Sequence, residues 1–523
     1  MVEEVGYWLI WADDDVDSEV ARLLTAGIEH QQAGRVAEAM DAYQAADGLA
    51  PDRYEARNNI AALLVQQGAI DRAITLLEAC RQQAPEDLRV ASNLMHVQVR
   101  GGDWAAAEAT LAAIQDREGP QAWTEINRGT CWLAMLDPIR ARRHFERALA
   151  LDPAYEMAQE KIIYLADFDP ATTPGEALAL RRDWYERFGR PVAPVTVDHD
   201  NDPDPDRPLR VGYVSGDWHA HSALYCFGPV VRRHSPAVIP YAYSSTTHPP
   251  DPFTASLRQA VAEWREIAGM PDEEVADLIR RDRIDILVDL SGFTTNSRLL
   301  VFCRKPAPVQ VTAWGYATGT GCLQIDAFFA DRVVVRPDQY GAYSEQVITL
   351  PSVVPYEPPW VPPFDYAPAV GPLPAAATGR ITFGSLNRAE KMHPGVAQVW
   401  AEILLGVPGS RLILKSHQLT MPPVQARVRG WFEACGIEAE RVELSGTTPH
   451  AVHMGRLNEI DISLDPFPHS GGVSTLESLW MGVPVVTRIG PRSVERLSGS
   501  FLMQIGASRW VTETEADYVA IAT

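Results

Sequence analysis

The sequence predicts an α-helical repeat solenoid followed by an α/β region of two Rossmann-like lobes. A pattern recurs every 34 residues in the first third of the chain. From Leu209 onward, short β-branched runs alternate with longer amphipathic ones, which is typical of parallel sheets covered by helices. At 523 residues the chain is too long for one hydrophobic core, so several domains are expected.

The repeat is visible at fixed offsets. Glycine recurs at Gly34, Gly68 and Gly102, and Leu136 takes the next place. Five residues later comes an alanine, then four further on a large apolar residue: Ala39, Ala73, Ala107 and Ala141, with Tyr43, Leu77, Leu111 and Phe145. Pro51, Pro85 and Pro153 end the units, because proline cannot continue a helix. The pattern resembles tetratricopeptide repeats, and predicts about four stacked helix pairs over 20–155 after a leader, 1–19. We expect such an array to bind peptides or partner proteins.

The remaining chain divides into a connector and two α/β lobes. Residues 156–208 are expected to be helical and then, from 190, a Pro- and Asp-rich linker. The first lobe, 209–374, has expected strands at 209–215, 238–244, 284–292 and 309–315 and a helix at 272–282. The second lobe, 375–523, has expected strands at 380–387, 411–416, 441–446, 460–465 and 483–487. Ligands of such folds bind where strands end and helices begin, so a cleft between the lobes is the expected site.

Composition narrows the class of partner. A net charge of −22 argues against nucleic acid or an anionic membrane as the main partner. The six cysteines are scattered without a CxxC pair, as in reduced proteins of the cytoplasm. Acidic flanks make the N-terminus a poor signal peptide, and no run of about 18 apolar residues could span a membrane. We therefore expect a soluble, cytoplasmic protein.

The strongest local signal is LDPFPHSGGVSTLESLWMGVPVVT, residues 464–487. A strand is expected to end near Asp465, and a helix to open at Ser474 and Thr475 after the Gly471-Gly472 turn. Glycines let the backbone approach a phosphate, and a helix N-terminus offers free N–H groups and partial positive charge. The carboxylate of Glu477 could accept hydrogen bonds from a ribose. An N-capped helix behind a tight turn would look the same.

This segment resembles the sugar-nucleotide loop of the O-GlcNAc transferase family, glycosyltransferase family 41, including its SPINDLY-like branch. LRVGYVSGDWHAHS, DILVDLSGFTTNSR, RKPAPVQVTAWGYATGTG, FGSLNRAEKMHP and HMGRLNEIDISLD agree in order, over about 209–510. The resemblance implies a GT-B fold, tetratricopeptide repeats as partner domain, and inverting transfer from a nucleotide sugar to protein side chains. It implies neither a metal ion nor a bound cofactor.

The resemblance also implies roles for individual residues. Lys391 matches the lysine that contacts the donor diphosphate, and Asn387 and Arg388 share its loop. His453 matches the histidine near the nucleobase, with Arg456 one turn later. His221 matches the histidine facing the reacting centre, where it, Asp217 or His219 could accept a proton. The expected donor-binding set also includes Gly471, Gly472, Val473, Ser474, Thr475 and Glu477, and the expected sugar or acceptor side includes Thr294, Thr318 and Thr320.

The chain departs from the family pattern in several places. Val473 stands where the family often has a histidine or threonine, and its side chain cannot donate a hydrogen bond. GYATGTG replaces a more usual Tyr-Pro-Gly-Thr, and the chain ends at Thr523, where family members normally continue. A repeat scaffold with a degenerate transferase domain is therefore the non-enzymatic alternative, and a nucleotide-sugar epimerase is a third.

The expected function is transfer of a sugar to Ser or Thr of a protein held by the repeats. UDP-GlcNAc is the family's default donor, and GDP-fucose is the alternative. The sequence identifies neither the acceptor protein nor the group that takes up the proton. It also does not decide whether the protein forms a homodimer.

Overall fold

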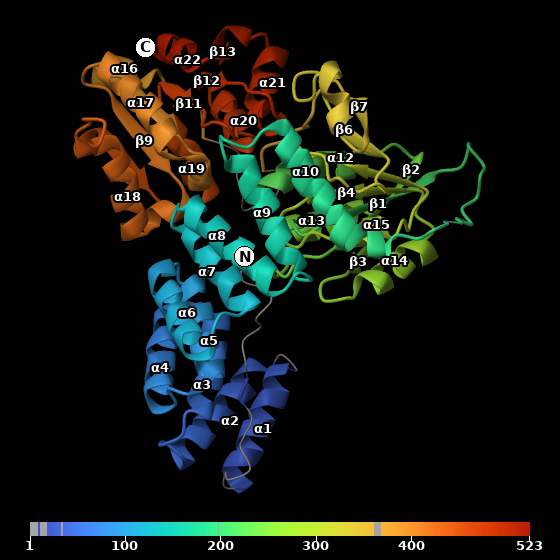
Figure 1. Ribbon diagram of the computed structural model, residues 1–523, viewed down its shortest axis with the longest axis vertical. Helices are drawn as coiled ribbons and strands as arrows, with labels where there is room; N and C mark the ends of the chain where they lie inside the picture. Colours follow the sequence, from blue (N-terminus) through green and yellow to red (C-terminus); the bar gives the residue numbers. More distant parts are fainter. Residues whose placement is uncertain (1–8, 11–17, 33–34, 197, 360–367) are drawn as a thin grey trace. The chain divides into compact units, whose positions relative to one another are not determined.

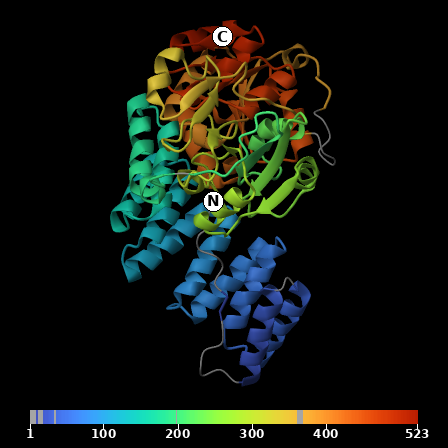
Figure 2. The same ribbon diagram turned by 90° about the vertical axis from the view of Figure 1, so that its right-hand side faces the viewer.

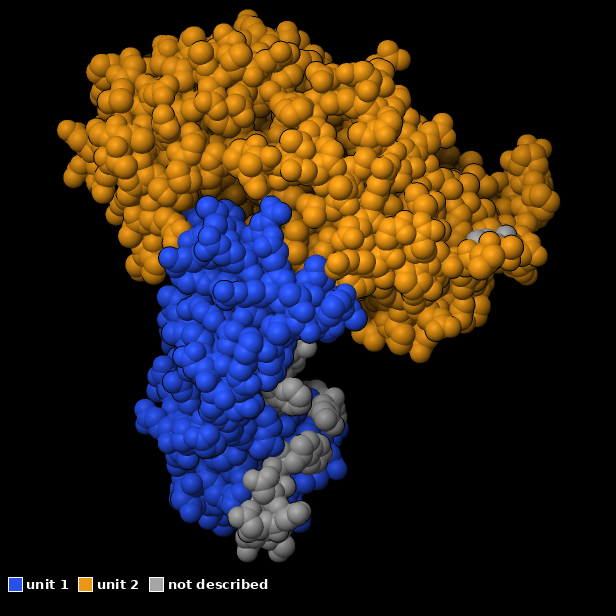
Figure 3. Space-filling model, in the orientation of Figure 1, with its two compact units in different colours: residues 1–155 blue, residues 156–523 orange. Residues whose placement is uncertain are grey.

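The computed structural model describes residues 9–10, 18–32, 35–196, 198–359 and 368–523. The chain divides into two compact units, residues 1–155 and 156–523, coloured separately in Figure 3. Gly34 of the predicted repeat lies outside the described residues. In the described part, no helix is both long and apolar enough to cross a membrane.

Unit 1 consists of helices in antiparallel pairs that follow one another along the chain (Figures 1 and 2). The four pairs are α1 (Ser18–Gln32) with α2 (Val36–Leu49), α3 (Glu55–Gln66) with α4 (Ile70–Gln83), α5 (Leu88–Arg100) with α6 (Trp104–Glu118), and α7 (Ala122–Ala134) with α8 (Pro138–Leu151). The tetratricopeptide prediction of about four helix pairs is confirmed.

The repeating residues form the core and the turns of this unit. The four alanines and the four large apolar residues of the pattern are all 0% exposed. Gly68 and Gly102 adopt positive φ angles of 76° and 77° between the paired helices, a conformation in which glycine has no steric penalty. Leu136, at the next repeat position, adopts φ 59° as well. The turn geometry is therefore kept even where glycine is replaced.

Unit 2 contains two fully parallel sheets. The first has the strand order β3-β2-β1-β4-β5-β6-β7. Its strands are β1 (Leu209–Ser215), β2 (Val238–Ser244), β3 (Glu263–Glu266), β4 (Ile286–Asp289), β5 (Val309–Thr312), β6 (Ala327–Ala330) and β7 (Gln346–Thr349). Helices α12 (Ser222–Arg232), α13 (Pro252–Ala260), α14 (Asp272–Arg281) and α15 (Leu299–Cys303) connect them. The sequence predicts β1, β2, β4, β5 and α14, and misses the short strands β3, β6 and β7.

The second sheet has the order β10-β9-β8-β11-β12-β13. Its strands are β8 (Thr382–Ser385), β9 (Arg411–Lys415), β10 (Val442–Ser445), β11 (Ile462–Leu464), β12 (Val485–Arg488) and β13 (Val511–Thr512). Its helices are α16 (Pro374–Thr378), α17 (Pro394–Gly406), α18 (Pro422–Glu433), α19 (His450–Leu457), α20 (Val473–Trp480), α21 (Leu497–Gln504) and α22 (Glu515–Ala522). In both sheets the order reverses beside the first strand, as in doubly wound nucleotide-binding folds, so the predicted pair of Rossmann-like lobes is confirmed.

The helical part of the predicted connector belongs to unit 2. It forms α9 (Glu156–Phe168), α10 (Pro174–Trp184) and α11 (Arg190–Val192). Trp184 and Tyr185 are 0% and 3% exposed in the core of the first lobe, where Ile163 of α9 also packs. These helices are therefore part of the lobe's core and do not act as a spacer.

The two lobes share a hydrophobic cluster. Leu497 and Phe501 of α21 pack with Phe328 and Val334 of the first lobe. Arg496, which is 1% exposed, donates to Oε1 of Gln339 in the first lobe at 2.6 Å. α21 thus ties the second lobe to the first.

Candidate functional site

Many of the predicted site residues lie in loops that leave the carboxyl ends of strands, whereas His453 and Arg456 lie on α19 and Val473, Ser474, Thr475 and Glu477 lie on α20. Asp217 to His221 follow β1, Thr294 follows β4, and Thr318 and Thr320 follow β5. On the second lobe, Asn387 to Lys391 follow β8, and the 465–472 loop follows β11. This is the edge at which doubly wound sheets bind nucleotides.

The glycine loop after β11 forms the start of α20. Gly472 is the N-cap and, as a glycine, has no side chain with which to cap the helix, so the first N–H groups of α20 are available to a ligand. A Cβ atom on Gly471 would lie 2.2 Å from Oγ1 of Thr475 and 2.7 Å from Oδ1 of Asp465, so only glycine fits there. A Cβ atom on Gly472 would meet nothing within 4 Å. The backbone at Gly472 is therefore open to approach.

Asn387 and Lys391 join this loop from the β8 side. The Ser474 hydroxyl donates to Oδ1 of Asn387 at 2.7 Å, and Nζ of Lys391 donates to the carbonyl of Ser470 at 2.6 Å. Lys391 is 7% exposed. Burial, followed by the charge of Arg388, lowers the pKa of Lys391 to about 7. The result is a buried lysine amine beside the start of a helix, an arrangement that favours a bound anion.

Val473 and Thr475 serve packing in this loop. The Val473 side chain packs against the hydrophobic core of the first lobe. Oγ1 of Thr475 shares a hydrogen bond with Oγ of Ser498 at 2.7 Å, and Thr475 is 2% exposed. The hydroxyl of Ser474 is thus the one in this turn that faces the Asn387 loop.

Glu477 is held by two histidines of α19. Its carboxylate contacts Nε2 of His450 at 3.1 Å and Nε2 of His453 at 3.3 Å. Burial alone would raise the pKa of Glu477, but the hydrogen bonds and charges of the two histidines lower it to about 2. Nδ1 of His453 is 3.0 Å from Nζ of Lys415. The structure therefore brings together Glu477 and His453, as predicted, and adds His450 and Lys415.

Arg456 is engaged elsewhere. Its guanidinium forms ion pairs with Glu459 at 2.8 Å and with Glu443 of β10. It lies close enough to lower the pKa of Lys415, but its hydrogen bonds go to these two carboxylates. The hydrogen bonds and ion pairs of Arg456 thus go to Glu459 and Glu443 rather than to Glu477 or His453.

The first lobe contributes a cluster of histidines and one carboxylate. Oδ1 of Asp217 is 3.4 Å from Nδ1 of His221, and the ring of His219 is 4.1 Å from that of His248, centre to centre. The Ala223 N–H donates to Nδ1 of His221 at 3.3 Å, which favours the neutral tautomer with its proton on Nε2.

The surroundings push the pKa values of this cluster in opposite directions. Burial raises the pKa of Asp217 to about 6. Burial lowers the pKa of His221 to about 4, helped by the positive charge of Arg388 from the second lobe. The His221 side chain is still 44% exposed, so water reaches the ring. At pH 7, Asp217 is ionised and is a stronger base than the neutral His221.

The three predicted threonines have different surroundings. Thr320 is 1% exposed, and both its hydroxyl and its N–H donate to Oε1 of Glu345 at 2.6 Å. Thr294 donates its hydroxyl to the carbonyl of Ser291 at 2.8 Å. Thr318 is 6% exposed, and its N–H donates to the carbonyl of Tyr316. The Thr320 hydroxyl therefore ties its loop to Glu345, and the Thr294 hydroxyl bonds within its own loop.

Helix α9 supplies residues that sequence reasoning missed. The hydroxyl of Tyr164 accepts from Arg388 at 3.1 Å, and the ring of Phe168 stacks on that of His469 at 4.5 Å. His469 is 6% exposed, and its Nε2 atom has no hydrogen-bond partner among the described residues. The spacing of Tyr164 and Phe168, one helical turn, was visible in the sequence, but nothing there connects α9 with the 469–472 loop.

The fold and this geometry can now be compared with known proteins. The sequence matches the family described as Glycosyl transferase family 41 over residues 193–354 and 372–523, which is more than half of the chain. The chain belongs to glycosyltransferase family 41. Its first third matches the tetratricopeptide repeat family over residues 30–91 and 64–124.

Individual proteins are similar to this chain over most of its length. A mutant of the Thermobaculum terrenum O-GlcNAc transferase has 32% sequence identity and a TM-score of 0.75, covering 97% of this chain and 89% of that one. A protein of Oryza sativa subsp. japonica is 34% identical over 387 residues, 72% of this chain and 41% of its own length. It is named a probable UDP-N-acetylglucosamine–peptide N-acetylglucosaminyltransferase SPINDLY. The Arabidopsis thaliana protein of that name is 33% identical over 381 residues.

The chain differs from its relatives in length and at Val473. The chain spans about 40% of the length of the SPINDLY relatives that it matches. Val473, which departs from the family pattern, is partly buried and packs against the hydrophobic core of the first lobe. The departure therefore leaves the backbone N–H groups, Ser474 and Lys391 as the donors around the helix start.

Proposed function

We propose that this family 41 member is an inverting protein O-glycosyltransferase of the cytoplasm that needs no metal ion or bound cofactor. It would move a sugar from a nucleotide donor to Ser or Thr of a protein bound by the repeats. The observation that carries the proposal is the anion site formed by Lys391 and the uncapped start of α20. A nucleoside diphosphate leaving group has the charge that this site would stabilise.

The reaction would be a direct displacement. The acceptor oxygen forms a bond to the anomeric carbon while the bond from that carbon to the diphosphate oxygen breaks. The electron pair leaves with the diphosphate, toward Lys391 and the N–H groups of Val473 and Ser474. Fixed positive charge at this point stabilises the transition state more than the ground state, because the negative charge grows as the bond breaks.

Asp217 is our candidate for the group that takes the acceptor proton. Its pKa of about 6 makes it ionised at pH 7, whereas the pKa of His221 lies near 4 and its Nδ1 atom already accepts from Ala223. A proton acceptor works best when its pKa lies near the working pH. His221, whose neutral ring carries its proton on Nε2, would hydrogen-bond the sugar or the acceptor through that atom.

The nucleoside and the sugar would extend to either side of the diphosphate. Glu477, held ionised by His450 and His453, would accept hydrogen bonds from a ribose diol, and the His453 ring would stack on the base. UDP-GlcNAc is the donor we favour, because the relatives at 33–34% identity are named as probable enzymes that use it. GDP-fucose stays the alternative donor.

The test is a donor panel with purified full-length chain. UDP-GlcNAc, UDP-glucose and GDP-fucose are each incubated with the chain and candidate acceptors, and transfer is read by mass spectrometry of intact protein. Calorimetry with UDP and GDP is run in parallel. Transfer from one donor, with binding of the matching nucleotide, supports the proposal, and a chelator should leave the rate unchanged.

The alternative function is a repeat scaffold without transferase activity. Nucleotide binding without hydrolysis or transfer from any donor would favour a scaffold that senses nucleotide. Absence of nucleotide binding as well would contradict the proposed anion site.

A further inference from the structure

Lys415 lies beside the pair of Glu477 and His453, at the carboxyl end of β9. It is the last residue of that strand, which pairs in parallel with β8, the strand that leads into the loop of Lys391. Lys415 is 5% exposed, and its Nζ atom lies 3.0 Å from Nδ1 of His453. Its ammonium is therefore buried at the edge where the nucleotide of the donor is proposed to bind.

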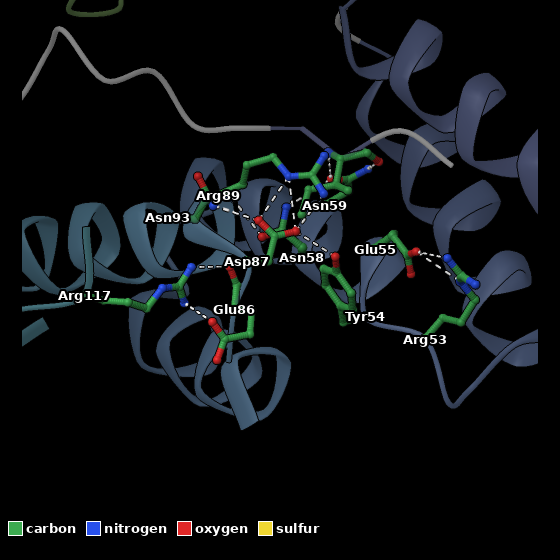
Figure 4. A network of polar contacts seen from close by, with 11 residues as sticks. Arg53, Tyr54, Glu55, Asn58, Asn59, Glu86, Asp87, Arg89, Asn93 and Arg117 are labelled. Carbon is green, nitrogen blue, oxygen red and sulfur yellow. Dashed lines mark hydrogen bonds and ion pairs between the residues drawn. The ribbon is translucent and has the colours of Figure 1, made fainter. Parts of the chain in front are cut away.

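Lys415 differs in its partners from other partly buried charges of the protein. Such charges pair with one another elsewhere, as Arg53 does with the buried Glu55 in the repeats (Figure 4). Among the residues that the structure describes, no carboxylate forms an ion pair with Lys415, and His453 is its one hydrogen-bond partner. An ammonium group has three N–H donors. Two donors of Lys415 are therefore without a partner in the described part of the chain.

The surroundings make this position unfavourable for a charged amine. Burial lowers the pKa of Lys415, the charge of Glu477 opposes this shift, and the charge of Arg456 adds to it. The Glu477 carboxylate already binds His450 and His453, at 3.1 and 3.3 Å. A ligand oxygen that accepts from Lys415 would therefore offset a cost that the fold leaves uncompensated.

The contact with Lys415 also fixes the tautomer of His453. An ammonium can only donate, so Nδ1 of His453 accepts from Lys415, and the ring proton lies on Nε2, which donates it to Glu477. Both ring nitrogens of His453 are thus engaged within the protein. The ring can stack on a base through its face, but hydrogen bonds to the edge of that base have to come from neighbouring groups.

His450 supplies an unpaired acceptor next to this unpaired donor. Its Nε2 atom contacts the ionised carboxylate of Glu477 at 3.1 Å, so the proton is on Nε2 and Nδ1 is the acceptor. Nδ1 of His450 is buried and has no hydrogen-bond partner among the described residues. The rings of His450 and His453 lie 28° from parallel, with their centres 6.1 Å apart. The His453 ring therefore has both a free donor and a free acceptor in its vicinity.

The four common nucleobases differ in what they offer to such a pair. Uracil and guanine have a carbonyl oxygen beside a ring N–H group, which is an acceptor next to a donor. Cytosine and adenine have an amino group at the corresponding place, beside a ring nitrogen without a proton. A lysine would share a hydrogen bond with the carbonyl, but it would face the amino group donor to donor.

We infer that Lys415 is a specificity-determining residue, which donates a hydrogen bond to the carbonyl oxygen of the base and so selects uracil and guanine over cytosine and adenine. This inference rests on the proposed nucleotide-sugar site and deepens it by assigning the class of base. The discrimination is roughly 10- to 100-fold in affinity, as expected for one hydrogen bond to a charged group in a buried place.

The experiment measures nucleotide affinity with the full chain and without any sugar. UDP, CDP, GDP and ADP are titrated by calorimetry into the wild type, Lys415→Met and Lys305→Met. Methionine keeps the length of the lysine side chain and removes its donors. Lys305 is the matched control, because its ammonium lies in the first lobe, where it pairs with Asp326 at 2.5 Å and donates to the carbonyl of Gln324.

The wild type should bind UDP at least about 10-fold more tightly than CDP, or GDP at least about 10-fold more tightly than ADP, according to the size of base that the site takes. In Lys415→Met, binding of the preferred nucleotide should weaken while that of its amino counterpart does not. The ratio of the two dissociation constants should then fall to about threefold or less. Lys305→Met should keep the wild-type ratio.

Three results would overturn the inference. They are a wild type without this preference, a Lys415→Met variant that keeps the preference, and an equal loss for both nucleotides of a pair, which would assign Lys415 to the phosphates or the ribose. If Lys415→Met fails to fold, Lys415→Gln is measured with the same criteria, because an amide can either donate or accept. A wild type that binds none of the four nucleotides would contradict the proposed function too, whereas a chain that binds them but transfers no sugar would contradict the proposed function alone.

Discussion

At the scale of single residues, the anion site depends on one buried lysine. Lys391 is 7% exposed, and its burial lowers its pKa to about 7, so the charged form is disfavoured in the folded, ligand-free protein. This burial therefore destabilises the fold below the unfolded pKa of 10.5, and fully so below pH 7. A bound diphosphate favours the charged form and raises the pKa again.

Lys391→Met should therefore abolish UDP binding yet raise the melting temperature of the ligand-free chain at pH 7 by a few degrees. The gain in stability should shrink toward pH 10, where the wild-type lysine is neutral in both states. In the wild type, UDP affinity should fall as pH rises above about 7, because binding then has to take up a proton. Calorimetry and thermal melts across pH 6.5–10 measure both effects.

The control for this variant is Arg281→Met, which removes an exposed cation at the end of α14. It should change neither the affinity nor its pH profile. A Lys391→Met protein that still binds UDP like the wild type would contradict the assignment of the anion site.

Asp217 makes a second prediction at this scale. Because the ionised carboxylate is required, the turnover rate should fall about tenfold per pH unit below pH 6. Asp217→Asn should lower kcat by about 10²-fold or more while the dissociation constant of UDP stays the same. His221→Gln should lower the rate but keep the acid limb near pH 6. Two results would instead make His221 the proton acceptor. One is full activity of Asp217→Asn, and the other is a loss of the rate decrease at acid pH only in His221→Gln.

At the scale of elements, the repeats depend on left-handed turns between helices. Gly102 has φ 77° and joins α5 to α6, whereas Gly48 lies exposed inside α2. A Cβ atom at either glycine would meet nothing within 4 Å, so the two sites differ in backbone conformation alone. This makes them a matched pair for testing what the repeat period encodes.

Gly102→Ala should destabilise the array by about 1 kcal/mol, because L-residues are strained at positive φ. Gly48→Ala should stabilise it by about 0.5–1 kcal/mol, because glycine inside a helix is unfavourable relative to alanine. Urea unfolding followed by circular dichroism at 222 nm measures both. If both substitutions changed the free energy of unfolding in the same direction, the turn geometry would not be the reason for the glycine at position 102.

At the scale of the whole of unit 2, helix α9 links the lobes. Oδ2 of Asp167 accepts from Tyr316 of the first lobe at 2.7 Å, and its carboxylate pairs with Arg181 of α10. On the other side, Arg492 of the second lobe donates to the carbonyl of Ala166 at 2.6 Å. The α9 helix therefore positions the Tyr164 and Phe168 contacts of the site relative to both sheets.

Asp167→Ala should lower the stability of unit 2 by about 3–5 kcal/mol, because it leaves the buried Arg181 unpaired. UDP affinity should fall as well, since Arg388 and His469 contact the same helix. The control is Asp183→Ala on α10, whose pair with Arg187 is exposed and worth under about 1 kcal/mol. Urea unfolding followed by tryptophan fluorescence measures the stability of both variants. Equal losses of stability in the two variants would contradict the bridging role of α9.

The sequence by itself determined the fold class and most of the site loops. The 34-residue period places the buried alanines and the turns, because a repeat has to bury the same face in every unit. Strand–helix alternation places the carboxyl ends of all strands of a lobe at the same edge of its sheet. Lys391, Ser474 and the Asp217 loop follow strands and therefore lie at that edge. These features are local, so a single pass along the chain detects them.

Only the tertiary structure decided which side chains meet. Asp167 and Tyr316 are 149 residues apart, Ile10 and Asn59 are 49 apart, and neither pair has a sequence signal. Arg456 pairs with Glu443 and Glu459 and makes no contact with Glu477, although its helical spacing put it beside His453. Periodicity encodes which face of an element is buried, but the partner on the facing element depends on how the elements pack. That is why the sequence predicted the residues of the proposed anion site, while the structure supplied the α9 contacts, the His450 contact with Glu477 and the hydrogen bond between Ile10 and Asn59.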